Sequence, residues 1–430
     1  MKITRRYFLQ TTGALAAYCG VAPFPSLGAA AQTVSGPVAS GKTLVSIFLR
    51  GGIDGLNLIV PYADPGYAKL RTNLRIYNPG QDEGCLDLDG SFGLHPRAGA
   101  LIEAFDAGHA VAAHAVGYGR NSRSHFEEQD VWETGVIGNT VGSDGWLNRH
   151  LLTSEGRGPV RAVALGDALP RILRGDAPAY AIKGLADLGL PPSQQQGAIT
   201  AALEHAYQCD PRKEAADATT LVRDTGAQTL EGMKLIQTVA NQPYKPAADY
   251  PGTGLANQLK AAARLIKADV GVEVIQIDYG GWDTHNNQGN GIEGNYGNKV
   301  EQLAEALAAF TKDLGDRLDD VLVLTLSDFG RTARENGTRG TDHGWANAML
   351  ALGGPVAKTG DKAGVGSEKR RKVLTDWPGL MPDQLHQNRD LMHTTDFRDV
   401  LSEVVARHLG NPNLGKVIPG HQPKPVGLIA

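Results

Sequence analysis

The feature that most constrains the fold is an apolar run at residues 321–326, which ends abruptly at Ser327, Asp328 and a Phe-Gly-Arg sequence. A short run of this kind, rich in β-branched residues, indicates a strand that is buried on both faces. Such strands belong to parallel sheets covered by helices. In open α/β sheets ligands bind beyond the carboxyl ends of the strands, so we expect Asp328 to lie at the edge where a site would form.

Two further predicted strands, at residues 43–49 and 272–277, are also followed by acids or histidines. Strands that alternate with helices along the chain predict an α/β fold with a doubly wound, mostly parallel sheet. Parallel strands end at one edge of a sheet, so side chains that are distant in the sequence can meet there. The candidate metal ligands at this edge are Asp54, Asp283, His285, Asp328 and His343.

Mixed carboxylate and imidazole ligands suit zinc, manganese or iron, and ligands from several loops can hold one or two such divalent ions. Each candidate also has a purely structural interpretation. An aspartate after a strand often caps a helix or forms a turn, which applies most to Asp54. A lone histidine is more often packed or hydrogen-bonded. The close pairing of Asp283 with His285, beside Trp282, favours a metal site instead.

Ser124 is the candidate nucleophile, and Ser122 is the rival. Ser124 follows a predicted buried strand at residues 110–116 and precedes a predicted helix, so its hydroxyl would lie among free backbone N–H groups that favour an anionic substrate. Ser124 with Glu127 three residues later is also a plain capping box, and both interpretations stay open. Arg331, with Arg120 and Arg123 as alternatives, is the candidate clamp for a phosphate or sulfate oxyanion, and each could equally be a surface charge.

The N-terminal segment has the form of an export signal. Arg5 and Arg6 precede a mildly apolar stretch and a group of small residues. This pattern predicts a twin-arginine signal peptide over residues 1–30, recognised by the twin-arginine export machinery. A single domain over residues 31–430 would then reach the periplasm or be secreted. A short membrane anchor is the alternative, but glycines and a proline interrupt the apolar stretch.

Composition restricts the remaining classes of function. The 430 residues are 41% hydrophobic and carry a net charge of −4, with no basic patch of the kind that nucleic-acid binding needs. No later apolar run is long enough to span a membrane, so no stable span is expected after the signal is removed. Beyond the signal, Cys85 and Cys209 remain, and their spacing does not decide whether they pair.

Several of these motifs together resemble the bacterial domain of unknown function 1501 family. The motifs are the twin-arginine leader and residues 49–57, 124–126, 281–285, 327–332, 341–344 and 394–400. That family resembles a branch of the alkaline phosphatase and sulfatase superfamily. The resemblance implies an alkaline-phosphatase-like sheet with two metals at its carboxyl edge. It assigns metal ligands to Asp54, Asp283, His285, Asp328 and His343, and the nucleophile to Ser124.

Two departures limit the resemblance. Phe329 stands where the superfamily has a histidine after Asp328, and the formylglycine signature of sulfatases is missing around Ser124. The sequence therefore favours an exported, metal-dependent hydrolase of a phosphate ester or related anionic ester, small or borne on a polymer. A non-catalytic cell-envelope binding protein that keeps the fold and one metal is the alternative.

Overall fold

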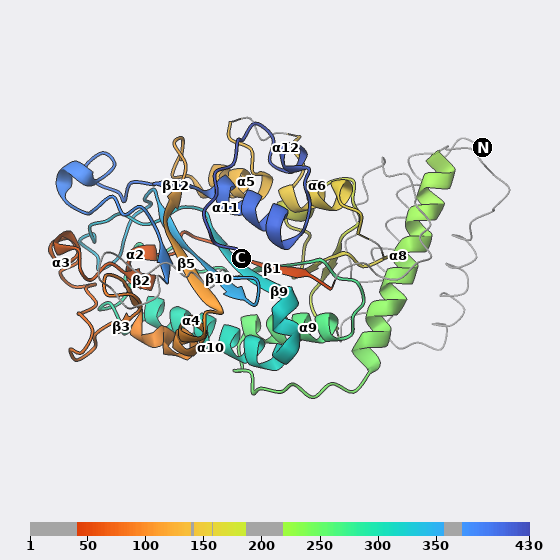
Figure 1. Ribbon diagram of the computed structural model, residues 1–430, viewed down its shortest axis with the longest axis horizontal. Helices are drawn as coiled ribbons and strands as arrows, with labels where there is room; N and C mark the ends of the chain where they lie inside the picture. The colour runs from red at the N-terminus through yellow and green to blue at the C-terminus, as the bar shows by residue number, and fades with distance from the viewer. Residues whose placement is uncertain (1–40, 139–141, 157, 186–217, 357–371) are drawn as a thin grey trace.

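The computed structural model describes residues 41–138, 142–156, 158–185, 218–356 and 372–430, and every element below belongs to that part of the chain (Figure 1). The predicted signal peptide, Cys209 and a glycine- and lysine-rich segment at residues 358–371 lie outside the described residues. Cys85 is buried.

The described chain is built on a large sheet whose strands run in the order β11-β5-β10-β9-β1-β8-β6-β7, with β12 paired to β5. All neighbours pair in parallel except those of β10, which is antiparallel to both β5 and β9. The predicted α/β class with a mostly parallel sheet is therefore confirmed. The strands are β1 (Thr43–Leu49), β5 (Ala110–Gly117), β6 (Ala162–Leu165), β7 (Tyr180–Ile182), β8 (Val274–Asp278), β9 (Val321–Ser327), β10 (Asn347–Gly353), β11 (Val373–Leu374) and β12 (Thr395–Asp396).

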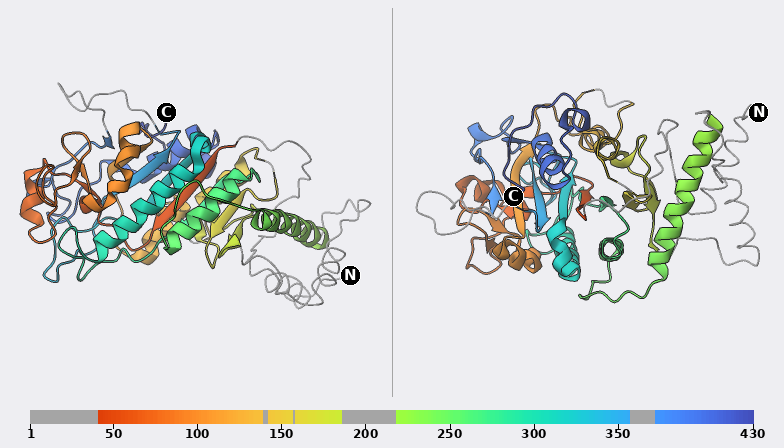
Figure 2. Two further views of the ribbon diagram at one scale, coloured as in Figure 1. Left: turned by 90° about the horizontal axis from the view of Figure 1, so that it is seen from below. Right: turned by 45° about the vertical axis from the view of Figure 1, so that its right-hand side comes forward.

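Helices cover both faces of this sheet, which is why its central strands are apolar throughout. Alternate residues of β1 point into two different cores: Val45 and Ile47 pack with the first set of helices, and Leu44 and Phe48 with the second. The first set is α4 (Ile102–Ala107), α8 (Ala218–Asn241), α9 (Gly254–Lys267) and α10 (Asn295–Leu314). The second set is α5 (His125–Thr134), α6 (Trp146–Thr153), α11 (Phe397–Glu403) and α12 (Leu414–Val417). Figure 2 shows α9 and α10 side by side across the first face.

A smaller antiparallel sheet in the order β2-β4-β3 lies at one end of the molecule (Figure 1). Its strands are β2 (Ile59–Val60), β3 (Leu86–Asp87) and β4 (Gly93–Leu94), and the short helices α2 (Gly55–Leu58) and α3 (Pro65–Leu70) accompany it. The remaining described elements are short helical turns. One is a π-helical turn at Val404–His408, and the others are three-ten turns at Pro96–Leu101, Arg171–Leu173, Gly315–Asp320 and Pro382–Gln384.

One local prediction was wrong in detail. The capping box expected at Ser124 does not form, although α5 begins where it was predicted. The carboxylate of Glu128 instead accepts from the backbone N–H and hydroxyl of Ser122, at 2.7 and 2.9 Å.

Strand register brings three chain segments to one edge of the sheet. Leu49 pairs with Ser327, and Phe48 pairs with Asp278, so β9, β1 and β8 end side by side. The loops that follow them carry the candidate ligands, and β5 on the other side of β10 ends at the same edge before it leads to α5. The fold thus gathers four loops around one point.

Candidate metal centre

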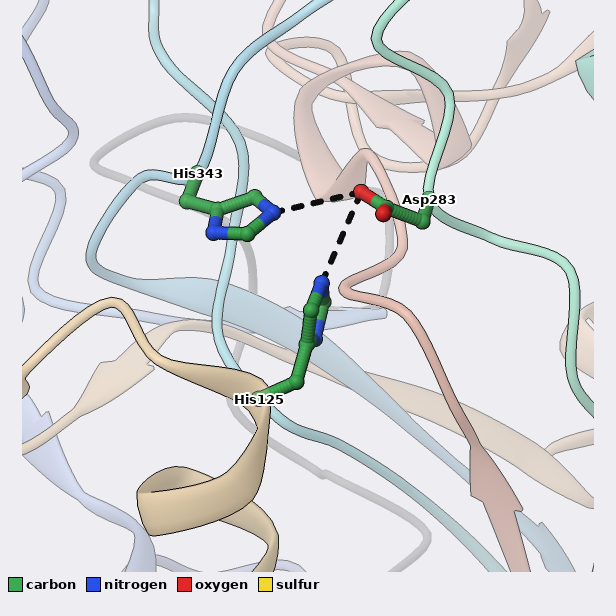
Figure 3. Close-up of side chains that lie close together, drawn as sticks. All are labelled: His125, Asp283 and His343. Carbon is green, nitrogen blue, oxygen red and sulfur yellow. Dashed lines mark hydrogen bonds and ion pairs between the residues drawn. The ribbon is translucent and has the colours of Figure 1, made fainter.

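One carboxylate oxygen lies at the centre of a cluster of imidazoles. Oδ1 of Asp283 is 3.5 Å from Nε2 of His125, 3.0 Å from Nε2 of His285 and 3.2 Å from Nε2 of His343. His125 is the first residue of α5, and the other three side chains come from the loops after β8 and β9. Figure 3 shows His125, Asp283 and His343 pointing toward one another. The ligating atoms of His125, Asp283 and His343 all lie within 4.8 Å of one another, which is compatible with one ion.

Each histidine uses its other ring nitrogen to contact an acceptor. Nδ1 of His125 donates to Asp328 Oδ2 at 2.5 Å, and Nδ1 of His285 donates to Asp342 Oδ1 at 2.9 Å. Nδ1 of His343 donates to the backbone carbonyl of Arg123 at 2.8 Å. A proton on Nδ1 leaves Nε2 with a free lone pair, so three lone pairs face the same region. Metal-ligating histidines are held in this way.

The contact between two of these histidines needs a cation or a shared proton. Nε2 of His285 and Nε2 of His343 are 2.9 Å apart, and their Nδ1 partners assign both as lone-pair acceptors. Two acceptors at this distance repel each other. The contacts of Asp283 Oδ1 with the three imidazoles and of His285 with His343 range from 2.9 to 3.5 Å. Ligand atoms about 2.05 Å from one tetrahedral ion lie about 3.3 Å apart. In the described chain, the residues whose ligating atoms are all mutually close are His125, Asp283 and His343, and this set fits a divalent ion.

Arg331 orients the carboxylate of Asp283 by a direct ion pair. Its Nη2 donates to Asp283 Oδ1 at 2.6 Å. Burial raises the pKa of Asp283, but the hydrogen bond and charge of Arg331 outweigh this effect and hold that pKa below its usual range. The remaining guanidinium donors contact the backbone carbonyls of Gly51, Gly52, Trp282 and Thr341. The buried Arg331 therefore joins three loops, and the structure does not present it to a substrate as the sequence suggested.

Phe329 forms an apolar wall of the cluster. Its ring lies 4.7 Å, between ring centroids, from both His125 and His343. Burial lowers the pKa of His343, which favours the neutral form that a ligand needs. The hydrogen bond to Asp328 raises the pKa of His125, against the opposing effect of burial. Within the described chain, the buried Nε2 of His125 has no hydrogen-bond partner.

Asp328 lies at the predicted edge of the sheet, but it is outside the cluster and contacts it through His125. Its buried carboxylate accepts from His125 Nδ1, from Gln129 Nε2 at 2.9 Å and from the backbone N–H of Gly51 at 3.2 Å. These contacts make Asp328 the group that orients His125. The expectation that Asp328 itself joins Asp283, His285 and His343 as a ligand is replaced by this arrangement.

Asp54 is held outside the cluster by an ion pair. Arg71 contacts both its carboxylate oxygens, at 2.5 and 2.9 Å, and Gln288 Nε2 donates to Oδ2 at 2.6 Å. The side chains of Asp54 and Arg71 are 1% and 0% exposed. A carboxylate shared between these donors serves to fix the loop after β1, so the structure does not bring Asp54 together with the other candidates.

Ser124 directly precedes His125 and occupies the N-cap position of α5, but its side chain makes no capping hydrogen bond. Its backbone N–H donates to Ser122 Oγ at 3.2 Å. The capping interpretation therefore loses its main support. The structure leaves Ser124 partly exposed next to the cluster.

Sequence reasoning missed His125. A histidine at the start of a helix has no distinguishing local pattern, and its role depends on where the end of β5 places α5. The available signal was its neighbour Ser124, since a histidine beside a candidate nucleophile at a strand end lies at the same edge as the other ligands.

None of the helices that the structure describes is long and apolar enough to cross a membrane.

A comparison with curated proteins finds no match. A comparison with protein-family models matches the family described as "Protein of unknown function (DUF1501)" over residues 95–420. This range includes His125, Asp283, His285 and His343, and it covers more than half of the 430 residues. The family resemblance expected from the motifs is confirmed. The chain belongs to the DUF1501 family.

Proposed function

We propose that this protein is a metal-dependent hydrolase of a phosphate ester or a related anionic ester. The observation that carries the proposal is the contact of His285 and His343 through their Nε2 atoms, beside Asp283, with every Nδ1 already donated. Neutral imidazoles in this arrangement are stable when a cation lies between them. Without a cation, one of the two histidines would have to be an imidazolium that donates from both ring nitrogens, and the metal analysis below distinguishes the two cases.

Imidazole-rich sites with a carboxylate suit zinc first, and manganese or iron next. A bound divalent ion would supply Lewis-acid polarisation of the ester and would lower the pKa of the attacking hydroxyl or water. The ligand side chains are accessible: Asp283 is 45% exposed, His285 37% and His343 24%. Catalytic metal sites keep such an open face, whereas structural sites are closed.

The start of α5 supports an anionic substrate. His125 is the first residue of this helix, so the unpaired backbone N–H groups of its first turn lie next to the cluster. The helix dipole adds a partial positive charge at that end. Because the donors of Arg331 are used internally, we assign recognition of the oxyanion to this helix end.

Ser124 is the proposed nucleophile within this site. It lies at the N-cap of α5, directly before a proposed ligand, and its hydroxyl is not used in capping. Attack by its hydroxyl would form a covalent ester on the chain and release the alcohol, and water would then complete hydrolysis. Direct attack by water is the other route within the same function.

The test combines metal analysis with an ester panel. Protein purified without added metal is analysed for zinc, manganese and iron, and is assayed on phosphate, phosphodiester and sulfate esters before and after chelation. We expect close to one ion per chain, and ester hydrolysis that chelation abolishes and the same ion restores. Metal-replete protein that hydrolyses none of these esters would contradict the proposal.

The variant Ser124→Ala separates the two routes. If Ser124 is the nucleophile, hydrolysis is lost while the metal content stays unchanged; if water attacks directly, hydrolysis persists. Ser122→Ala, two residues earlier, is the matched serine control. It removes a hydroxyl that donates to Glu128 and accepts from the backbone N–H of Ser124, so turnover should fall by less than in Ser124→Ala.

One observation favours a second candidate, a non-catalytic cell-envelope binding protein. The buried ring of Phe329 packs on both His125 and His343, where a second set of ligands would have to enter. A site restricted to one ion could serve stability alone. Both candidates share the proposed export, which rests on the twin arginines Arg5 and Arg6.

A further inference from the structure

The segment between β5 and α5 contains one residue in a strained backbone conformation. Arg123 has a φ of 59°, in the left-handed region that non-glycine residues rarely adopt because Cβ clashes with the backbone. Strained residues persist only where the surrounding structure holds them, and they are concentrated at functional sites. Arg123 lies directly before Ser124, the proposed nucleophile, and His125, a proposed metal ligand.

Hydrogen bonds to nearby side chains fix where this segment turns. The backbone N–H of Arg123 donates to Asn121 Oδ1 at 2.7 Å, and the backbone N–H of Ser124 donates to Ser122 Oγ at 3.2 Å. Ser122 is held in turn by Glu128. These contacts use only the backbone of residue 123. They give no reason for an arginine at a position where glycine would be unstrained.

The side chain of Arg123 is anchored to a second segment of the chain. Its Nε and Nη2 donate to Asp390 Oδ2 at 3.0 and 2.5 Å, and Nη2 also donates to Gln387 Oε1 at 2.9 Å. Asp390 is 0% exposed, and Arg389 contacts the same oxygen at 3.3 Å. Burial raises the pKa of Asp390 and the two arginines oppose this effect; the short contacts with Arg123 fit the ionised carboxylate.

The backbone carbonyl of Arg123 reaches the metal centre. It accepts from Nδ1 of His343 at 2.8 Å, the contact that leaves Nε2 of His343 free to hold an ion. The direction of this carbonyl depends on the backbone conformation of residue 123. A change out of the left-handed region would therefore move the acceptor away from His343.

We infer that Arg123 is a positioning residue for the metal centre. Asp390 holds its side chain, and this anchor stabilises the left-handed backbone that directs the carbonyl at His343. The sequence suggested Arg123 as an alternative clamp for an oxyanion, but its guanidinium donates to Asp390 and Gln387 instead. The inference rests on the metal centre of the proposed function, and it names a group outside the ligand set that controls affinity for the ion.

The test is a cobalt(II) titration of the full chain after metal has been removed by chelation, with the thermal midpoint measured in parallel. The visible spectrum of cobalt(II) depends on the geometry of its ligands. Arg123→Ala removes the anchor and keeps a Cβ, so the left-handed conformation stays strained. Arg123→Gly removes the same side chain and relieves the strain. Both variants deprive Asp390 of the same partner, so a difference between them reports the backbone conformation.

We expect Arg123→Ala to bind cobalt(II) about tenfold more weakly than the unchanged chain, with an altered spectrum, and Arg123→Gly to lose less. Combining Arg123→Ala with Asp390→Ala removes the buried carboxylate that has lost its main partner. The thermal midpoint should then rise above that of Arg123→Ala, whereas the cobalt affinity should stay low. The combined variant also keeps the inference testable if Arg123→Ala does not fold.

Arg161→Ala is the matched control. Arg161 contacts both carboxylate oxygens of Glu273, at 2.7 and 2.8 Å. These residues directly precede β6 and β8, at the opposite edge of the sheet from the metal centre. The control should lower the thermal midpoint and leave the cobalt affinity unchanged.

Unchanged cobalt affinity and spectrum in folded Arg123→Ala, or an affinity that recovers together with the thermal midpoint in the combined variant, would overturn the inference. Equal losses in Arg123→Ala and Arg123→Gly would also overturn it, because the left-handed backbone would then play no part. If the unchanged chain binds no cobalt(II), the metal centre and the inference fail together. If the cobalt results are as expected but no ester is hydrolysed, only the proposed function fails.

Discussion

Replacing Asp328 by asparagine is expected to weaken metal binding without removing a ligand. The carboxylate accepts from His125 Nδ1 at 2.5 Å, from Gln129 and from the backbone of Gly51. Asparagine has a single acceptor oxygen, which can still accept from His125 and Gln129 because both donate to Oδ2, so its amide N–H₂ would face the backbone N–H of Gly51. His125 would then keep an acceptor for its Nδ1 proton but lose the negative charge beside its ring.

The magnitude follows from the burial and the number of bonds. A change to such an orienting group costs about 10–100-fold in metal affinity, and we expect the lower part of this range because the asparagine oxygen still accepts from His125. A change of about 10-fold corresponds to about 1.4 kcal/mol. The unpaired donor should also lower the free energy of unfolding by about 1–3 kcal/mol.

The assay is a zinc titration against a chromogenic chelator, with the thermal midpoint measured in parallel. Asp313→Asn is the matched control, because this buried carboxylate accepts from Lys267, Tyr244 and Tyr250 at a different place in the fold. It should lower stability and leave zinc affinity unchanged. Unchanged zinc affinity in folded Asp328→Asn protein would refute the reasoning.

Three further predictions follow from the same structure. Arg71→Met should cost about 3–5 kcal/mol in urea unfolding, because it leaves Asp54 buried without its partner; a loss below about 1 kcal/mol would contradict the role given to this pair. Stability should fall as the pH drops from about 6.5 towards 4: burial lowers the pKa of His95 and His114 to about 4, so the unfolded state binds more protons in that window, at up to about 3 kcal/mol for each histidine. Urea midpoints that do not change between pH 7 and 4.5 would contradict this, and His114→Gln should reduce the dependence. Replacing Arg5 and Arg6 by lysine should leave the protein in the cytoplasm in a fractionation assay, and normal export would exclude the twin-arginine route.

Continuous apolar runs made the central strands predictable. The strand predicted over residues 43–49 is β1, and the run at 321–326 is β9 with one added residue. The direction of β10 could not be read from its residues, because an antiparallel strand buried within this sheet has the same composition as a parallel one.

The sequence was sufficient to predict at which edge of the sheet the candidate site lies. Asp283, His285 and His343 meet there because their loops leave neighbouring strand ends. The roles of Asp54 and Asp328 depended on partners distant in the fold, Arg71 for one and His125 for the other. Neither ion pair has a local sequence pattern, so composition and spacing could not separate a ligand from the group that orients it.

The most direct test of the central claim is a crystal structure of the protein grown with zinc, with anomalous diffraction measured on both sides of the zinc edge. We predict one ion at about 2.0–2.2 Å from Nε2 of His125, Nε2 of His343 and a carboxylate oxygen of Asp283, with His285 as the further ligand. An ion held instead by Asp54 or Asp328, or no anomalous peak among these histidines at saturating zinc, would contradict the account.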